Sequence, residues 1–142
     1  MKSFFLLLIF AATLFATDAL EAAKKLGVEN QYEQALSKAQ KENKMLVMVI
    51  VKENCRWCDK IVNRTLSNDK VRKELEKYVT VIVDKDDVFP TDFKENFFPS
   101  IFYIDAKTQK SVYENVGYVG TKCFLNDLHS AQQTKETLYG SH

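Results

Sequence analysis

The sequence predicts an α/β domain with a mixed central β-sheet flanked by helices on both faces. Strand-like and helix-like patterns follow one another in the order helix, strand, helix, strand, loop, strand, strand, helix. The chain has no internal repeat, no Gly/Ser linker and no low-complexity tract, so nothing in it indicates a second domain. Without the apolar N-terminal segment, about 125 residues remain, which is enough for one sizeable core.

Each element has its own local signal. The first helix places Tyr32, Leu36 and Ala39 on one stripe, and Ser67 or Asn68 can cap a later helix. The strands are short apolar runs rich in β-branched residues. The predicted elements are a helix over 29–41, a buried strand over 45–51, helices over 59–66 and 69–77, a strand over 78–84, a loop with a short helix over 85–96, strands over 99–105 and 111–116, and a helix over 121–133.

The chain begins with the pattern of a secretory signal peptide. Lys2 supplies a positive charge, and residues 4–16 form an apolar run without charge. A helix of that length rises only about 20 Å, which is too short to cross a bilayer core of roughly 30 Å. Small residues follow, so we expect a signal peptide within residues 1–19, cleaved after Ala16 or after Ala19. This pattern favours an exported, periplasmic protein over one held by an uncleaved membrane anchor.

Charge and composition exclude several classes of function. Cleavage after Ala16 removes Lys2 and leaves 19 basic and 19 acidic residues, interspersed along the chain, and cleavage after Ala19 removes Asp18 as well. A neutral chain of this kind has no footprint for nucleic acid or for an anionic membrane. We expect a monomer, with the domain over residues 28–134 and a flexible C-terminal tail over residues 135–142.

Cys55 and Cys58 form a Cys-x-x-Cys pair where a predicted strand ends and a predicted helix begins. The helix N-terminus stabilises a thiolate at the first cysteine, and the second lies one turn further on the same face. We therefore expect Cys55 to attack a partner disulfide and Cys58 to resolve the mixed disulfide. Arg56 is expected to lower the pKa of Cys55, and Trp57 to give an apolar lip on which a substrate rests.

Other chemistry for this pair is less consistent with the sequence. A zinc site needs a second pair of ligands, and only Cys123, His129 and His142 remain to supply it. A c-type haem needs histidine after the second cysteine, where this chain has Asp59. An inert structural disulfide of this spacing would close too small a loop to stabilise much. We therefore predict no metal and no cofactor.

Cys123 is the third cysteine and lies in the last predicted helix. Its neighbours Phe124, Leu125 and Leu128 are apolar, so we expect Cys123 to be a buried free thiol in the core. A regulatory or intermolecular cysteine is the alternative.

Taken together, these features resemble the thioredoxin fold. The resemblance rests on the order of the elements, on the Cys-x-x-Cys pair at its junction, and on a strand-opening Pro99 that follows Cys58 by 41 residues. The chain is most similar to secreted bacterial thioredoxin-related proteins and to the C-terminal domain of the disulfide reductase DsbD. The similarity covers roughly residues 30–130 and includes the segments Thr65–Val71, Phe98–Asp105 and Val116–Tyr118.

The resemblance implies a substrate site as well as a reactive pair. Pro99 should be a cis-proline facing the dithiol, with Phe98 offering its backbone to a bound substrate strand. Disulfide-containing protein substrates and a membrane or periplasmic redox partner are implied, without a cofactor. The chain departs from the family at Val49, where thioredoxins have a buried acid, and at Asn54, where they have tryptophan. The family's general base is therefore not transferable, and Glu53 is an alternative proton relay.

Two classes of function stay open at this point. The first is an exported thiol–disulfide oxidoreductase that reduces or isomerises protein disulfides through Cys55 and Cys58. The second is a non-enzymatic module of the same fold that binds a partner or copper(I). The intact cysteine pair favours the first class, whereas the direction of electron flow is not decided by the sequence.

Overall fold

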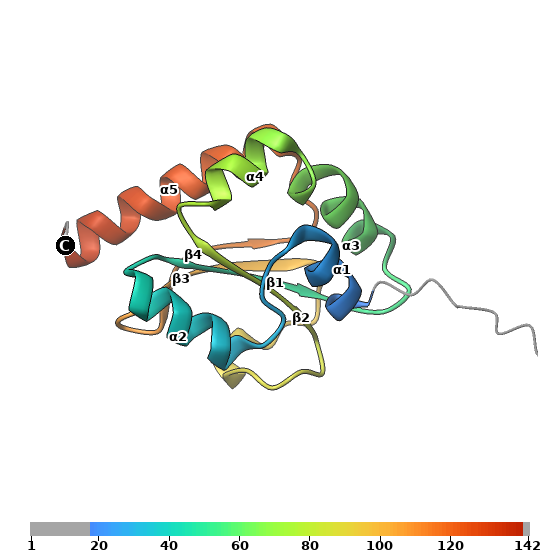
Figure 1. The fold of residues 1–142 in the computed structure, drawn as a ribbon, viewed down its shortest axis with the longest axis horizontal. Coiled ribbons are helices and arrows are strands. Elements are labelled where there is room, and N and C mark those ends of the chain that lie inside the picture. The colour runs from blue at the N-terminus through green and yellow to red at the C-terminus, as the bar shows by residue number, and fades with distance from the viewer. Residues whose placement is uncertain (1–17, 141–142) are drawn as a thin grey trace, which may run out of the picture.

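The computed structural model describes residues 18–140, which form a four-stranded sheet with helices on both faces (Figure 1). β1 is parallel to β2 and antiparallel to β3, and β3 is antiparallel to β4, which gives the strand order β2-β1-β3-β4. The predicted mixed sheet is thereby confirmed. The elements are α1 (Ala19–Leu26), α2 (Tyr32–Glu42), β1 (Leu46–Val51), α3 (Arg56–Lys60), the π-helical stretch η1 (Ile61–Leu66), α4 (Asp69–Leu75), β2 (Val79–Asp84), the 3₁₀ turn η2 (Thr91–Phe93), β3 (Ser100–Asp105), β4 (Lys110–Val116) and α5 (Thr121–Tyr139).

The central strand β1 is buried on both faces of the sheet. Val47, Val49 and Val51 belong to the core shared with α1, α4 and α5, whereas Met48 and Ile50 belong to the core beneath α2. A strand covered on both sides is a continuous apolar run, which is the pattern that predicted it. β1 therefore gives its carboxyl end, and the loop that follows, a rigid base.

Helix α1 was not predicted, and it extends the packed domain on the N-terminal side of residue 28. The Asp18 carboxylate accepts a hydrogen bond from the backbone N–H of Leu20 (2.9 Å) and caps the helix. Gly27 ends it in the left-handed conformation, with φ of 67°. The buried residues of α1 are Ala19, Ala22, Ala23 and Leu26. Residues 1–17 of the predicted signal peptide lie outside the described residues.

The predicted flexible tail over 135–142 is wrong for its first five residues, because α5 continues to Tyr139. Lys135 contacts the neighbouring strand there, with its Nζ 3.5 Å from Oδ1 of Asp105. This contact and the continuing helical hydrogen bonds hold the last turns of α5, whereas residues 141–142 lie outside the described part. No helix within residues 18–140 has both the length and the apolar character needed to cross a membrane.

The helix after the cysteine pair changes its winding part-way. α3 gives way to the π-helical stretch η1, in which the buried Thr65 donates its hydroxyl to the carbonyl of Val119 (2.7 Å). α4 then begins at Asn68, whose side chain accepts from the N–H groups of Lys70 and Val71. The predicted cap of this helix is thus confirmed at Asn68.

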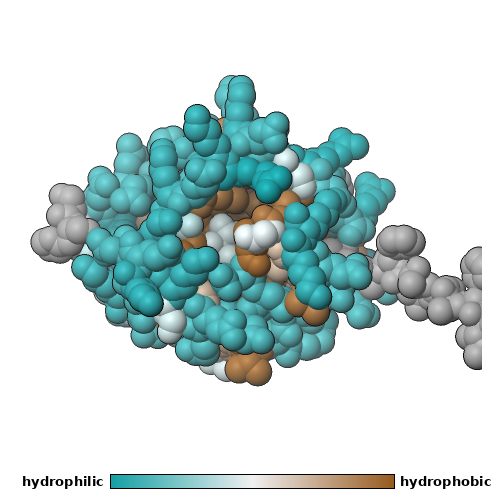
Figure 2. All heavy atoms as spheres, viewed as in Figure 1, coloured by the Kyte–Doolittle hydropathy of each residue, from teal (hydrophilic) through white to brown (hydrophobic). Residues whose placement is uncertain are grey.

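A hollow opens on the face that carries the edge strand β2, with apolar side chains inside a hydrophilic rim (Figure 2). It is a cavity of about 340 Å³ between β2 and the helices α1, α2 and α4, and its apolar lining includes Leu26, Leu66 and Leu75. The outer edge of β2 is bridged there by Glu29, which pairs with Val81. Neither cysteine of the Cys-x-x-Cys pair lines this cavity.

Candidate active site

The cysteine pair lies where the sequence predicts it, between a strand and a helix. After β1 ends at Val51, Asn54 turns the chain with a positive φ of 52°, a conformation that asparagine tolerates better than most residues. Cys55 follows as the N-cap of α3, and its Sγ accepts a hydrogen bond from the backbone N–H of Cys58 (3.2 Å). The sulfur of Cys55 therefore sits among the unpaired N–H groups of a helix start.

The two cysteines form a disulfide, with their Cα atoms 5.2 Å apart. They differ in exposure, since Cys55 is 7% exposed and Cys58 is 0% exposed. Both cysteines are thus buried, and only Cys55 keeps exposed surface toward a reagent or partner. After reduction, the N–H of Cys58 can donate to a Cys55 thiolate, and charge-assisted hydrogen bonds of this kind stabilise the anion.

Phe98 and Pro99 border the disulfide on the side of β3. The Sγ of Cys55 lies 3.8 Å from the carbonyl oxygen of Phe98, and the Phe98–Pro99 peptide bond is cis. Pro99 is buried, and its carbonyl accepts a hydrogen bond from the N–H of Gly117 (2.8 Å). The ammonium of Lys52 lies 5.7 Å from the centre of the Phe98 ring. The structure thus brings both predicted substrate-site residues to the reactive pair.

Four residues on this side form what we call the cationic rim, namely Arg56, Trp57, Lys60 and Tyr118. Trp57 is 44% exposed, and its ring lies 5.7 Å from that of Tyr118. The Lys60 ammonium lies 4.8 Å from the Trp57 ring centre and 4.6 Å from the Tyr118 ring centre. The Arg56 guanidinium lies 5.0 Å from the Trp57 ring centre. The predicted apolar lip is therefore also a positively charged surface.

Sequence reasoning missed Lys60 and Tyr118 as members of this rim. The spacing of Trp57 and Lys60, three residues apart on one helix, could have suggested that their side chains meet. Tyr118 gives no local signal, because it follows β4 and reaches the rim only through the pairing of β4 with β3.

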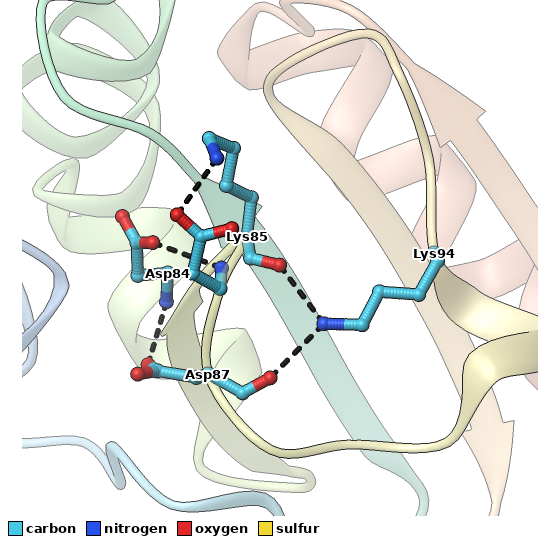
Figure 3. Close-up of polar contacts among 5 residues, drawn as sticks. Asp84, Lys85, Asp87 and Lys94 are labelled. Atoms are coloured by element: carbon cyan, nitrogen blue, oxygen red, sulfur yellow. Dashed lines mark hydrogen bonds and ion pairs between the residues drawn. The ribbon is translucent and has the colours of Figure 1, made fainter.

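An acidic turn, residues 84–87, follows β2 on the side of the site away from β4. Figure 3 shows the polar contacts of this turn. Its charges are engaged within the turn: Asp87 accepts from the N–H of Asp84 (2.8 Å), and Asp86 pairs with Lys85 (2.7 Å). Lys94 donates to the carbonyls of Lys85 (2.9 Å) and Asp87 (3.0 Å) and so ties the loop to the turn. Val51 pairs with Asp84 in the sheet, which places this turn beside the loop of the cysteines.

The hydrogen bond from Lys85 to Asp86 raises the pKa of Lys85, with further contributions from the charges of Asp84 and Glu53. Glu53, which is exposed, therefore adds its negative charge to the same flank as the acidic turn.

The phenylalanines of the loop after this turn differ in exposure. Phe89 and Phe93 are buried, at 7% and 4% exposure. Phe97, in contrast, is 69% exposed. Phe97, which directly precedes Phe98 in the chain, is thus an exposed aromatic residue next to the site.

Comparison with known proteins identifies the family. The family model of the thioredoxin-like domain matches residues 32–132, which is more than half of the chain. The chain belongs to the thioredoxin-like family. An uncharacterised protein of Borreliella burgdorferi is 29% identical over 118 residues, 78% of this chain and 51% of that protein, so the chain spans about half the length of this curated relative.

Solved structures share the thioredoxin-like fold. A thioredoxin from Thermus thermophilus superposes with a TM-score of 0.68 at 22% identity, covering 81% of this chain and 95% of that one. The oxidised C-terminal domain of DsbD from Neisseria meningitidis superposes with a TM-score of 0.58 at 16% identity, covering 75% of this chain and 99% of that domain. The resemblance to thioredoxins and to the DsbD domain, stated on sequence grounds, is thereby confirmed at the level of the fold.

This thioredoxin-like domain has an apolar floor beneath its cysteines. Val49 is 0% exposed and belongs to the same core cluster as Cys55 and Cys58. The position at which thioredoxins have a buried acid therefore holds no titratable group here.

The prediction for Cys123 is wrong, because its side chain is exposed. The buried face of α5 is set by Phe124, Leu128 and Ala131, which repeat at helical spacing. Cys123 precedes Phe124 by one residue, which rotates it by about 100° away from that face. It is thus an accessible thiol at the start of α5. Among residues 18–140, no group of three histidine, cysteine or acidic side chains is placed to hold a metal ion.

Proposed function

We propose that this chain is an exported thiol–disulfide oxidoreductase that uses Cys55 and Cys58 to reduce or isomerise protein disulfides. The observation that supports it best is the asymmetry of the pair. Cys55 is reachable at a helix N-terminus and receives the N–H of Cys58, while Cys58 is buried directly behind it. This asymmetry supports Cys55 as the attacking cysteine and Cys58 as the resolving one.

The exchange takes two steps that move two electrons. The Cys55 thiolate attacks one sulfur of the partner disulfide, which forms a Cys55–partner disulfide and releases the partner's other sulfur as a thiolate. The Cys58 thiolate then attacks Sγ of Cys55, which forms the Cys55–Cys58 disulfide and releases the second partner thiolate. Both partner thiolates take up protons. The partner is reduced and the domain is oxidised, and a membrane or periplasmic redox partner would return the domain to the dithiol state.

Phe98, Pro99 and Trp57 are proposed to hold the partner segment during this exchange. The carbonyl oxygen of Phe98 lies 3.8 Å from Sγ of Cys55. A partner backbone that lies beside Cys55 is therefore within reach of this carbonyl. The half-exposed ring of Trp57 offers apolar contact on the same side. Arg56 is proposed to stabilise the Cys55 thiolate through its charge, although its guanidinium also lies against the Trp57 ring.

Export is proposed from the charged and apolar pattern of the first residues. Of the two cleavage points considered, the one after Ala16 keeps Asp18, the N-cap of α1, in the mature chain. Cleavage after Ala19 would remove that cap and the first residue of the helix. Intact-mass measurement of the protein recovered from the periplasm distinguishes the two.

Insulin reduction driven by dithiothreitol tests the activity. The purified domain should accelerate the precipitation of insulin, and Cys55→Ser should abolish the acceleration. A module that only bound a partner or copper(I) would leave the insulin rate unchanged.

Trapping tests the order of attack. In a Cys123→Ser background, which removes the accessible third thiol, Cys58→Ser should accumulate mixed disulfides with substrates, while Cys55→Ser should accumulate almost none. Traps that appear with the two variants reversed would overturn the assignment of attacking and resolving cysteines.

A further inference from the structure

We propose that the cationic rim selects partner segments that carry an acidic residue next to the reacting cysteine. The inference rests on the proposed function, because the rim borders the disulfide. The expected partner is a protein segment with a carboxylate on one side of its cysteine.

The ion pairs found within the described residues do not involve the two cations of the rim. The ion pairs found in residues 18–140 are made by other lysines, which are Lys38, Lys44, Lys77, Lys85 and Lys135. Arg56 and Lys60 instead lie against aromatic rings, which attract a cation without neutralising it. α3 carries Asp59 as its one acid, so its two cations leave the rim with net positive charge.

The position of the Lys60 charge is fixed by two elements that are far apart in the chain. Its ammonium lies within 4.8 Å of the centres of both the Trp57 and the Tyr118 rings. Tyr118 follows Gly117, whose N–H binds the carbonyl of Pro99 (2.8 Å). A partner segment laid along Phe98 and Pro99 toward Cys55 therefore passes Tyr118 and the charge held beside it.

The other flank of the site carries a small excess of negative charge, because its four carboxylates, Glu53, Asp84, Asp86 and Asp87, outnumber its three cations, Lys52, Lys85 and Lys94. The acidic turn and the exposed Glu53 lie beside the end of β1, on the side of β2. An acidic residue of a partner is repelled from that flank and attracted to the rim. The two flanks together therefore set which side of the cysteine the acidic residue occupies.

This selection is tested with two peptide substrates, each of which contains a disulfide. The two peptides are identical except that one has glutamate and the other lysine beside the cysteine. The measured quantity is the rate at which the reduced Cys123→Ser protein reduces each peptide in low salt. We expect the glutamate peptide to react about two- to fivefold faster, as exposed charge pairs of this kind allow. The ratio should approach one in 1 M salt, where the Debye length is about 3 Å.

Charge variants locate the effect. Lys60→Gln should lower the ratio and Lys60→Glu should invert it. Lys107→Glu is the matched control, because Lys107 is exposed in the turn between β3 and β4 at the far end of the sheet. It makes the same change in net charge and should leave the ratio unchanged.

Hydroxyethyl disulfide, which is small and neutral, separates failure of this inference from failure of the proposed function. If the reduced protein does not reduce it, the proposed function is overturned, and the selection with it. If the protein reduces it but both peptides react equally, or Lys60→Glu keeps the wild-type ratio, the selection is overturned and the function stands.

Discussion

At the end of β3, Asp105 is nearly buried and has a full set of partners, whereas at the dithiol end of the sheet Arg56 and Lys60 lie beside aromatic rings. Asp105 is 2% exposed, accepts a hydrogen bond from the N–H of Thr108 (2.8 Å) and contacts Lys135 (3.5 Å). Both sites hold charge close to apolar side chains. The comparison shows two uses of charge. A charge with hydrogen-bond and ion-pair partners inside the fold stabilises the fold, whereas a cation that lies against aromatic rings remains available to a partner protein.

The largest effect on stability is expected from a buried charge that has no partner, introduced at the dithiol end of the sheet. Val49→Asp puts a carboxylate into an apolar cluster that offers nothing like Thr108 or Lys135, and should cost about 3 kcal/mol of unfolding free energy. Its negative charge should also favour thiol over thiolate at Cys55 and Cys58, which makes the domain a stronger reductant. Urea denaturation and the reduction potential measure the two effects.

Val49→Asn is the matched control for that substitution, since it is polar and of similar size but uncharged. Equal reduction potentials for the Asp and Asn variants would show that charge beneath the cysteines does not tune them, and that another group such as Glu53 already fills the role.

Removing the charge of Asp105 should have the next largest effect. Burial tends to raise the pKa of Asp105, but the hydrogen bonds from Thr108 and the charge of Lys135 outweigh it and lower that pKa below 3.8. The stabilisation is therefore present above about pH 4 and is lost as pH falls through the lowered value. Asp105→Asn should cost about 2 kcal/mol at pH 7, with wild type and variant converging in stronger acid.

Urea midpoints at pH 7, 4 and 3 test this dependence. Asp86→Asn, in the exposed turn on the other flank, is the control that removes a carboxylate whose side chain is 77% exposed. A constant difference between wild type and Asp105→Asn across the three pH values would contradict the assigned role of the charge.

A smaller effect concerns the reduction potential of the wild-type pair. The helix N-terminus, Arg56 and the absence of an acid at position 49 all favour the thiolate, by one to two pKa units together in our expectation. For two electrons one unit corresponds to about 30 mV, so the potential should lie near −240 to −210 mV rather than at the roughly −270 mV of thioredoxin. Equilibration with glutathione gives the value, and Arg56→Gln should move it back toward thioredoxin. A value at or below thioredoxin's would leave a dedicated reductase as the remaining interpretation.

The smallest effect is expected where charges pair in solvent. Lys38 and Glu29 lie 3.1 Å apart but are 51% and 30% exposed, so Lys38→Gln should change the unfolding free energy by less than about 0.5 kcal/mol. Lys135→Gln, whose side chain is 16% exposed beside Asp105, should cost more. Equal costs for the two variants would show that burial of the pair does not distinguish the two regions.

Much of the fold follows from local sequence patterns. The apolar run of β1, the polar cap at Asn68 and the strand opening at Pro99 each carry a signal within a few residues, and the structure places them as predicted. The position of the cysteine pair at a strand-to-helix junction follows from the same signals. α1 was missed because it directly follows the apolar N-terminal run: only its first residue, Ala19, falls within the predicted signal peptide, and residues 20–27 were assigned to no element.

The remaining features depend on contacts that no local pattern encodes. The exposure of Cys123 depends on the rotation of α5 against the sheet, which apolar neighbours in the sequence do not fix. The contact of Lys60 with Tyr118 joins α3 to the segment after β4, so it exists only once the strands are paired. The pairing of Lys135 with Asp105 is long-range in the same way.

Trp57 is the one tryptophan of the chain, and it lies on the rim rather than in the core. Its emission therefore reports on the surroundings of the disulfide, on the two cations over its ring and on any partner seated there. Fluorescence is thus a direct readout of docking and of redox state. Circular dichroism follows the sheet itself and is the complementary probe of unfolding.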